Sequence, residues 1–130
     1  TLEQTRPALS TGGETAEGSV DRVLLAQAWA SARLEAGLTL RQWAAAVKWH
    51  PVHFERVFKR ATGQSPMKWL EDRRMQAARQ YLSGTAKSVA EVASAVGYAD
   101  SFYFSRVFRK HFGRAPAKYR KLSFELTPME

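Results

Sequence analysis

The chain has 130 residues, 45% of them hydrophobic, and 20 lysines and arginines against 12 acidic residues give it a net charge of +8. That length predicts one domain or two very small ones. The absence of cysteine excludes a disulfide framework and a thiolate metal site, and no apolar run approaches the ~20 residues of a membrane span. We therefore expect a cytoplasmic protein without a membrane segment.

The positive charge is concentrated in the middle and C-terminal part of the chain. Residues 39–121 hold 17 basic and 5 acidic side chains, whereas the flanks hold 3 basic and 7 acidic ones. A segment this basic indicates a polyanionic partner. The alternative is an ordinary solvated helical surface rich in lysine and arginine.

Both ends of the chain lack an apolar period. Residues 1–19 combine Pro7 with three glycines and several hydroxyl residues, which predicts a flexible linker or tail. A helical stripe begins at Val20, with Asp21 as a candidate N-cap, and Gly37 would end this helix. Residues 122–130 are predicted to form a C-terminal tail.

Two short helices are expected next. Thr39 is a candidate N-cap for a helix from Leu40, Pro51 suits the first position of the following helix, and Gly63 suits its end. Two short helices joined by a tight turn form a helix-turn-helix unit. We assign residues 20–66 to a first helix-turn-helix subdomain.

The longest predicted helix follows this subdomain. It begins at Ser65-Pro66 and runs for roughly 17 residues, about 25 Å, to Gly84. Residues 66–83 are therefore expected to link two halves of the protein.

A second helix-turn-helix subdomain is predicted in residues 84–121. Ser88 would cap its first helix, and Gly97 would stop that helix because glycine accepts the left-handed conformation. Either Asp100 or Ser101 would cap the second helix. The outward face of this second helix is cationic, hydrogen-bonding and partly aromatic, which suits the major groove of DNA.

The two helix-turn-helix units repeat one pattern. The first helix and turn recur at an offset of 49: Leu40, Trp43, Ala44, Val47 and Trp49 correspond to Val89, Val92, Ala93, Val96 and Tyr98. The second helix and its sequel recur at an offset of 50: Phe54, Arg56, Val57, Phe58, Gly63, Pro66 and Trp69 correspond to Phe104, Arg106, Val107, Phe108, Gly113, Pro116 and Tyr119. Two such units on one chain could place two recognition helices in successive major grooves, about 34 Å apart.

The repeated motifs resemble the AraC/XylS family of bacterial transcription regulators. The matching residues are Phe58-Lys-Arg-Ala-Thr-Gly63-Gln-Ser-Pro66, the Arg74…Ala78 spacing, and Val92-Ala93…Val96-Gly97-Tyr98…Phe104-Ser-Arg-Val-Phe108…Phe112-Gly113…Pro116…Tyr119-Arg120. The resemblance covers about Val20 to Lys121. It implies an all-α fold of about seven helices, in which a long linker helix joins two helix-turn-helix subdomains.

The same resemblance implies a function and partners. We expect sequence-specific binding to double-stranded promoter DNA, regulation of transcription with RNA polymerase as a partner, and no cofactor. An effector ligand and dimerisation would involve a domain outside this chain. The protein would work in the bacterial cytoplasm, associated with the nucleoid.

The family reads bases from the outward, early positions of each second helix. Carried over by position, the predicted base-contacting residues are Val52, Glu55 and Arg56 in the first unit, and Ser101, Phe102, Tyr103 and Arg106 in the second. The predicted phosphate-contacting residues are the nearby basic and polar ones: His53, Lys59, Arg60, Ser105, Arg109, Lys110, Arg114, Lys118 and Arg120.

Several side chains have an alternative role. An arginine fork can bind guanine O6 and N7, but it can also contact phosphate or remain in solvent. Glu55 could accept from cytosine N4 or pair with Lys59 one turn later. Phe102 and Tyr103 could pack on thymine methyl groups or cover the turn between the helices as the rim of the core, and Val52 could touch a thymine methyl.

An enzyme or metal protein is not expected. The sequence has no nucleophile–base pair, glycine-rich phosphate loop or paired carboxylates at a plausible spacing. Its three histidines, His50, His53 and His111, lack an i, i+4 pair or a nearby cysteine, so we predict no metal site. Two binding functions remain as alternatives: an architectural protein without sequence preference, and a protein-interaction module that contacts RNA polymerase through Val20–Gly37 or the linker helix.

Overall fold

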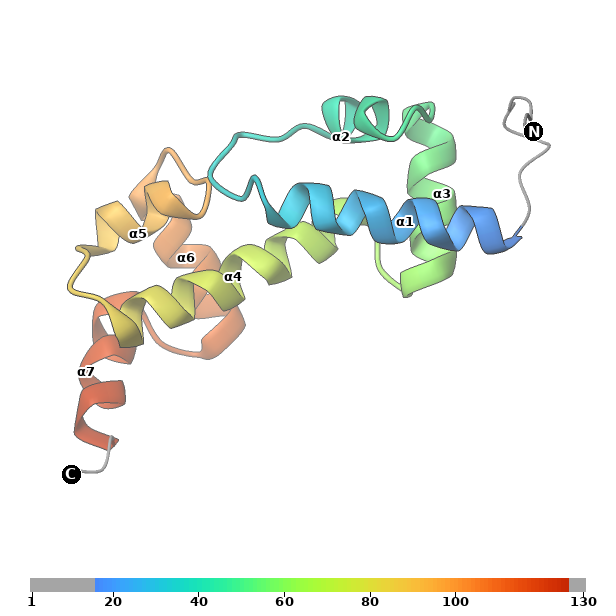
Figure 1. The fold of residues 1–130 in the computed structure, drawn as a ribbon. Coiled ribbons are helices and arrows are strands. Elements are labelled where there is room, and N and C mark those ends of the chain that lie inside the picture. Colours follow the sequence, from blue (N-terminus) through green and yellow to red (C-terminus); the bar gives the residue numbers. More distant parts are fainter. Residues whose placement is uncertain (1–15, 127–130) are drawn as a thin grey trace. The chain divides into compact units, whose positions relative to one another are not determined.

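The computed structural model describes residues 16–126, and these residues form seven α-helices and no strand (Figure 1). The helices are α1 (Ala16–Ser31), α2 (Leu40–Ala46), α3 (Pro51–Thr62), α4 (Pro66–Gly84), α5 (Val89–Ala95), α6 (Ser101–Phe112) and α7 (Pro116–Leu126). The all-α prediction is confirmed. None of these helices combines the length and the hydropathy that crossing a bilayer requires.

The chain divides into two compact units. Unit 1 contains α1, α2, α3 and the start of α4 up to Leu70, and unit 2 contains the rest of α4 from Glu71 together with α5, α6 and α7. The segment Arg33–Gly37, which connects α1 to α2, belongs to unit 2. A single helix, α4, therefore contributes to both units.

The short helices α2 and α5 begin with the same capping box. The hydroxyl of Thr39 accepts from the backbone N–H of Gln42 at 3.1 Å, and the Gln42 side chain accepts from the Thr39 N–H at 3.0 Å. Ser88 and Glu91 form the equivalent bonds at 3.0 and 2.7 Å. The hydrogen bond from the Ser88 backbone lowers the pKa of the Glu91 carboxyl. Both predicted caps are confirmed.

The longer helices α3 and α6 also start and stop alike. The side chain of His50 accepts from the Val52 N–H at 3.3 Å, and that of Asp100 accepts from the Phe102 N–H at 2.9 Å. Asp100, rather than Ser101, is thus the N-cap of α6. Both helices end on a glycine in the left-handed conformation, with φ of 84° after α3 and 80° after α6.

Each unit has its own apolar core, and nine buried positions of one core recur in the other. The buried residues of unit 1 that have a buried counterpart in unit 2 are Val23, Ala26, Ala30, Trp43, Ala44, Val47, Phe54, Val57 and Phe58, and Leu38, Trp49 and Leu70 are buried in unit 1 in addition. Those of unit 2 are Met75, Ala78, Leu82, Val92, Ala93, Val96, Phe104, Val107 and Phe108. The repeat therefore extends beyond the two helix-turn-helix motifs, because three buried positions of α1 recur in α4 at an offset of 52.

The start of α4 packs in unit 1, and the rest of α4 packs in unit 2. Trp69, near its start, packs on Phe58 of unit 1 with ring centroids 5.8 Å apart. Tyr119 of α7 packs on Phe108 of unit 2 at 5.4 Å in the same manner. The start of α4 therefore packs against the core of unit 1 in the way that α7 packs against the core of unit 2. The rest of α4 contributes buried residues to unit 2, as α1 does to unit 1.

The N-terminal helix differs from its prediction in bounds and in orientation. It begins at Ala16, inside the segment assigned to a flexible linker, and ends at Ser31, well before Gly37. The predicted stripe that includes Val20 and Leu24 faces solvent. The buried face is lined by smaller residues, and at Ala26 the backbone carbonyl accepts from the Trp43 indole N–H at 2.9 Å. Such a close approach leaves no room for the larger side chains of the other face.

The C-terminal helix is also longer than predicted. It runs to Leu126, into the segment 122–130 that the sequence assigned to a tail. The other residues assigned to tails, 1–15 and 127–130, lie outside the described part of the chain.

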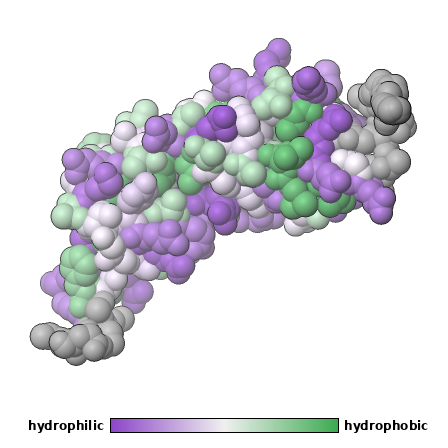
Figure 2. All heavy atoms as spheres, in the orientation of Figure 1, coloured by the Kyte–Doolittle hydropathy of each residue, from purple (hydrophilic) through white to green (hydrophobic). Residues whose placement is uncertain are grey.

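Figure 2 shows apolar residues gathered over α1, where Val20, Leu24 and Leu25 are largely exposed.

Candidate nucleic-acid interface

The second helix of each unit presents a polar and cationic face built by the same amphipathic pattern. In α6, Phe104, Val107 and Phe108 are fully or nearly fully buried, so the remaining positions must face away from the core. Arg106 is exposed among them. The equivalent residue of α3, Arg56, is exposed in the same way. Both predicted base-reading arginines therefore lie on the solvent side of their helices.

In unit 2 an aromatic pair supports this arginine. The guanidinium of Arg106 lies over the ring of Tyr103, 5.6 Å from its centroid. Tyr103 in turn packs against Tyr98 of the turn before the helix, with centroids 5.9 Å apart. Burial, with a smaller contribution from the Glu71 carboxylate, raises the pKa of Tyr98 to about 12, so its ring remains neutral at ordinary pH.

Phe102 and Tyr103, the two aromatic residues at the start of α6, were each predicted either to contact DNA or to form the rim of the core, and the structure distinguishes them. Tyr103 is 48% exposed and partly covers the turn, as the core-rim alternative predicted, while it also carries the guanidinium of Arg106. Phe102 is 78% exposed, which excludes a place in the rim of the core. These neighbouring residues therefore have different environments.

Unit 1 lacks this aromatic support. The residue that corresponds to Tyr103 is His53, which packs edge-on against Trp49 at 5.1 Å. Its Nε2 is buried, so a predicted phosphate contact through that atom is not open in this conformation. Within residues 16–126, no ring contact involves Arg56. Glu55 is exposed, and no ion pair joins it to Lys59 in that same range.

The predicted phosphate-contacting residues fall into two groups. Most of the basic ones are exposed, and four of them, Lys59, Arg60, Arg109 and Lys110, lie in the last turns of α3 and α6, where positive charge also complements the helix dipole. The exposed members are Lys59, Arg60, Arg109, Lys110, Arg114 and Lys118. Ser105 is half-buried.

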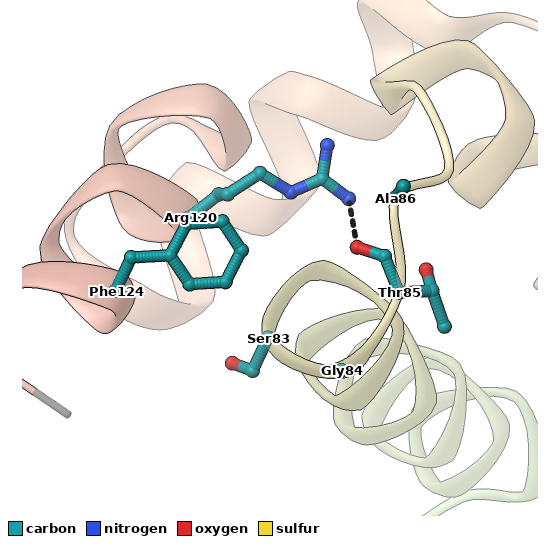
Figure 3. A pocket seen from close by; sticks show the side chains of 6 residues that line it. All are labelled: Ser83, Gly84, Thr85, Ala86, Arg120 and Phe124. Atoms are coloured by element: carbon teal, nitrogen blue, oxygen red, sulfur yellow. Dashed lines mark hydrogen bonds between the residues drawn. The ribbon is translucent and has the colours of Figure 1, made fainter. Parts of the chain in front are cut away.

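Arg120 has a structural role that the sequence did not reveal. Its Nε donates to the Leu82 carbonyl at 3.0 Å, and its Nη2 donates to the Thr85 carbonyl at 3.3 Å. Figure 3 shows the side chain extending from α7 towards the end of α4, at a pocket that Phe124 also lines. The guanidinium thus satisfies carbonyls at a helix C-terminus, a contact that competes with binding phosphate.

A buried arginine holds the turn that precedes α6. Arg74 of α4 donates from Nη2 to the Ala36 carbonyl at 2.9 Å and lies over the Tyr98 ring, 5.7 Å from its centroid. Burial lowers the pKa of Arg74. In the same place Gly97 has φ of 98°, and a Cβ there would lie 2.2 Å from the Leu34 carbonyl oxygen. The turn can therefore accept only glycine without rearrangement.

Unit 1 contains a counterpart of this arginine. Arg22 of α1 lies over Trp49, 5.1 Å from the ring centroid, and donates to the Val47 carbonyl at 3.4 Å. Arg22 and Arg74 are 52 residues apart, the same offset as the buried positions of α1 and α4. That offset was the signal in the sequence that could have revealed both residues.

A cluster of His111, Glu71 and Asp72 was also missed. The Nε2 atom of His111 lies 2.6 Å from a Glu71 carboxylate oxygen and 3.8 Å from an Asp72 oxygen. This cluster is the only group of potential metal ligands within residues 16–126. The short histidine–carboxylate contact already joins α6 to α4, and a metal ion would have to replace it.

Comparisons with known proteins agree with this geometry. A helix-turn-helix domain family matches residues 43–122. The chain is 39% identical over 105 residues to the MmsAB operon regulatory protein of Pseudomonas aeruginosa, covering 81% of this chain and 34% of that protein. It is 39% identical over 70 residues to the arabinose operon regulatory protein of Salmonella typhimurium, covering 54% and 25%. The chain thus spans about a third or less of these two relatives.

Two solved structures match this chain over nearly their whole length. The DNA-binding domain of the transcriptional factor AdpA, in complex with a target DNA, superposes with a TM-score of 0.80 at 28% identity, covering 84% of this chain and 98% of that one. An AraC-type transcriptional regulator from Chromobacterium violaceum superposes with a TM-score of 0.75 at 29% identity, covering 85% and 99%. The chain belongs to the AraC-type family of helix-turn-helix DNA-binding domains of transcription regulators.

Proposed function

We propose that this chain binds double-stranded promoter DNA at two half-sites and reads each with one helix, α3 or α6. The observation that carries the proposal is the duplicated exposed face. Val52 and Phe102, and likewise Arg56 and Arg106, are exposed at equivalent positions of two helices whose cores match. Such a pair of recognition helices suits successive major grooves on one side of the duplex.

The side chains would divide the work by position. Arg56 and Arg106, in the middle of their helices, would contact base edges, and Ser101, near the start of α6, would assist by hydrogen bonding. The exposed lysines and arginines at the helix ends would neutralise phosphates, which gives affinity but little sequence preference. Of the residues with predicted DNA contacts, His53 and Arg120 are the two that packing supports least.

The wider biological role is also a proposal. The relatives are regulators of several operons, and this chain spans only a fraction of them. We expect the protein to act without catalysis in the bacterial cytoplasm, at the nucleoid, and to contact RNA polymerase. Effector binding and dimerisation would reside in a region outside this chain.

Selection of bound duplexes from a random pool tests the proposal directly. The selected sites should carry two conserved half-sites with centres about one helical turn apart, and footprinting should protect both. The affinity for the selected site should exceed that for a scrambled duplex by about 10³-fold or more at physiological salt. A ratio near one, with a strong dependence on salt, would instead identify an architectural protein that binds through charge alone.

A further inference from the structure

Both candidate recognition helices expose an apolar side chain at the same early position. Phe102 is 78% exposed and Val52 is 64% exposed. Each is the second residue of its helix, after Ser101 in α6 and Pro51 in α3. One exposed apolar residue is ordinary on a protein surface, but the same exposure in both copies of a duplicated unit points to a shared use.

The direction of these side chains is set by the N-caps. The backbone N–H of Val52 donates to the His50 side chain, and the N–H of Phe102 donates to the Asp100 carboxylate. These bonds hold the first turn of each helix in place, so the apolar group projects from a defined position. Neither side chain is needed for the core, because the buried stripe starts two residues later at Phe54 and Phe104.

Each apolar residue lies one helical turn before an exposed arginine. Val52 precedes Arg56 by four residues, and Phe102 precedes Arg106 by four residues. Side chains four apart on a helix lie on the same face, about 5–6 Å from each other at Cβ. That separation corresponds to one or two base-pair steps of B-DNA, at about 3.4 Å each.

The neighbouring residues do not compete for this apolar role. Tyr103 is engaged by the guanidinium of Arg106 and by the ring of Tyr98. His53, at the equivalent position of α3, lies against Trp49. Glu55 and Ser101 are polar. The early part of each helix thus offers one apolar group and one arginine to a ligand.

The base edges of the major groove contain one group that an apolar side chain can recognise, the 5-methyl group of thymine. An arginine fork matches guanine through O6 and N7. We propose that Val52 and Phe102 each read a thymine methyl group, within two base pairs of a guanine that Arg56 or Arg106 reads. This inference rests on the proposed function, and it adds that the two half-sites share a thymine and a guanine at this spacing.

Removing single thymine methyl groups from the DNA tests the inference. Starting from the selected duplex, each thymine is replaced in turn by deoxyuridine, which lacks only the 5-methyl group, and the Kd is measured by fluorescence anisotropy. We expect one position in each half-site to lose affinity by about fourfold, the effect of burying about one methyl group. The loss should be larger in the half-site bound by α6, because the phenylalanine ring can cover more of the methyl surface than valine.

Matched protein variants then assign each methyl group to its residue. In Phe102→Ala the deoxyuridine effect should disappear from the α6 half-site and persist in the other, and Val52→Ala should show the reverse. Lys110→Ala should weaken binding to every duplex while both deoxyuridine effects persist. All three positions are exposed, so thermal unfolding of the variants should remain close to that of the wild type.

The outcomes separate this inference from the function on which it rests. If the selected duplex is bound specifically and no single deoxyuridine changes the Kd by more than about 1.5-fold, methyl reading is wrong and sequence-specific binding stands. If the deoxyuridine effects survive in both alanine variants, other side chains read the methyl groups and the assignment is overturned. If the selected and scrambled duplexes bind equally, the proposed function itself fails.

Discussion

The two units have matching cores and each exposes an arginine at the same position of its second helix, yet they differ in what surrounds that arginine. In unit 2 the guanidinium of Arg106 lies on Tyr103, and Tyr103 packs on Tyr98. In unit 1 the residue equivalent to Tyr103 is His53, which packs against Trp49. Within the described residues, no aromatic ring contacts the guanidinium of Arg56. A duplicated motif can thus keep its core while the exposed arginine of its second helix has a different environment in each copy.

The turns before the two helices show the same contrast. Gly97 and Lys48 occupy equivalent positions, and both have a positive φ, 98° and 61° respectively. At Gly97 the Leu34 carbonyl approaches so closely that no side chain fits. Lys48 is exposed and accepts the strained conformation of a non-glycine residue. An arginine from another helix contacts each turn, but only in unit 2 does the close approach of a backbone carbonyl require glycine at the positive-φ position.

The largest expected effect comes from filling the tight turn. Gly97→Ala would place a Cβ against the Leu34 carbonyl and the Arg74 side chain in a conformation that alanine rarely adopts. We expect a loss of about 3 kcal/mol or more in the free energy of unfolding, measured by chemical denaturation. The matched change Lys48→Gly should alter it by less than about 1 kcal/mol, since relief of strain and the flexibility of glycine oppose each other. Equal effects at both positions would show that the two turns do not differ.

The next effect is on DNA reading. Arg106→Ala should cost about 1–3 kcal/mol of binding free energy at one guanine and relax the preference there, because the bidentate contact is lost. Lys110→Ala should weaken binding to all sequences alike and reduce the slope of affinity against salt concentration. Competition binding with single-base variants of the selected duplex measures both. Uniform loss in both variants would contradict the division between reading and neutralising residues.

At alkaline pH the turn of unit 2 should lose about 1–2 kcal/mol of its contribution to the free energy of unfolding through Tyr98, whereas the turn of unit 1 should not. The pKa of Tyr98 is raised to about 12 in the folded chain, against 10.0 for the ordinary side chain. The unfolded chain therefore ionises first, so the stability from neutral Tyr98 is complete below pH 10 and is lost as the pH rises to about 12. Trp49, at the equivalent position, has no such titration.

The measurement is the difference in unfolding free energy between the wild-type chain and Tyr98→Phe, followed from pH 9 to pH 12. The difference should change by about 1–2 kcal/mol in favour of the phenylalanine variant across this range. A constant difference would show that the phenol is not protected from ionisation by the fold.

The smallest expected effect tests the aromatic support of Arg106. Tyr103→Ala should weaken specific binding by about 0.5–1 kcal/mol, the strength of an exposed cation–π contact, while Tyr103→Phe should retain most of it. His53→Ala should not alter the guanine preference attributed to Arg56. Affinities for the selected duplex and for its guanine variants provide the test. An equal loss in the phenylalanine and alanine variants would indicate that the hydroxyl group, not the ring, contributes.

Local signals in the sequence were sufficient for most of the helix bounds. Capping residues and helix-ending glycines act within one or two turns, so Thr39, Ser88 and Gly63 could be assigned without tertiary information. The duplication of the helix-turn-helix motifs, with their large aromatic residues, was also visible. The prediction failed at α1, where the buried face consists of small residues that look no more apolar than the exposed face.

Some features of the candidate interface could likewise be predicted from the sequence, and others depend on tertiary contacts. Helical periodicity alone placed Arg56 and Arg106 on exposed faces, because the buried stripe leaves those positions no other direction. The different environments of Phe102 and Tyr103 depend on Tyr98, which is held by Arg74 from another helix. The structural contacts of Arg120 likewise involve residues 35 and 38 positions away.

The amino-acid sequence by itself therefore determined the helices from α2 to α6, the caps of α2 and α5, the repeat of the helix-turn-helix motifs and the cationic faces, since each depends on local sequence patterns. Only the tertiary structure decided which face of α1 is buried, which arginines support the turns, and which aromatic side chain remains exposed to a ligand. Those properties depend on which distant backbone carbonyls and rings come within a few ångströms of a side chain, and helical periodicity carries no information about such distances.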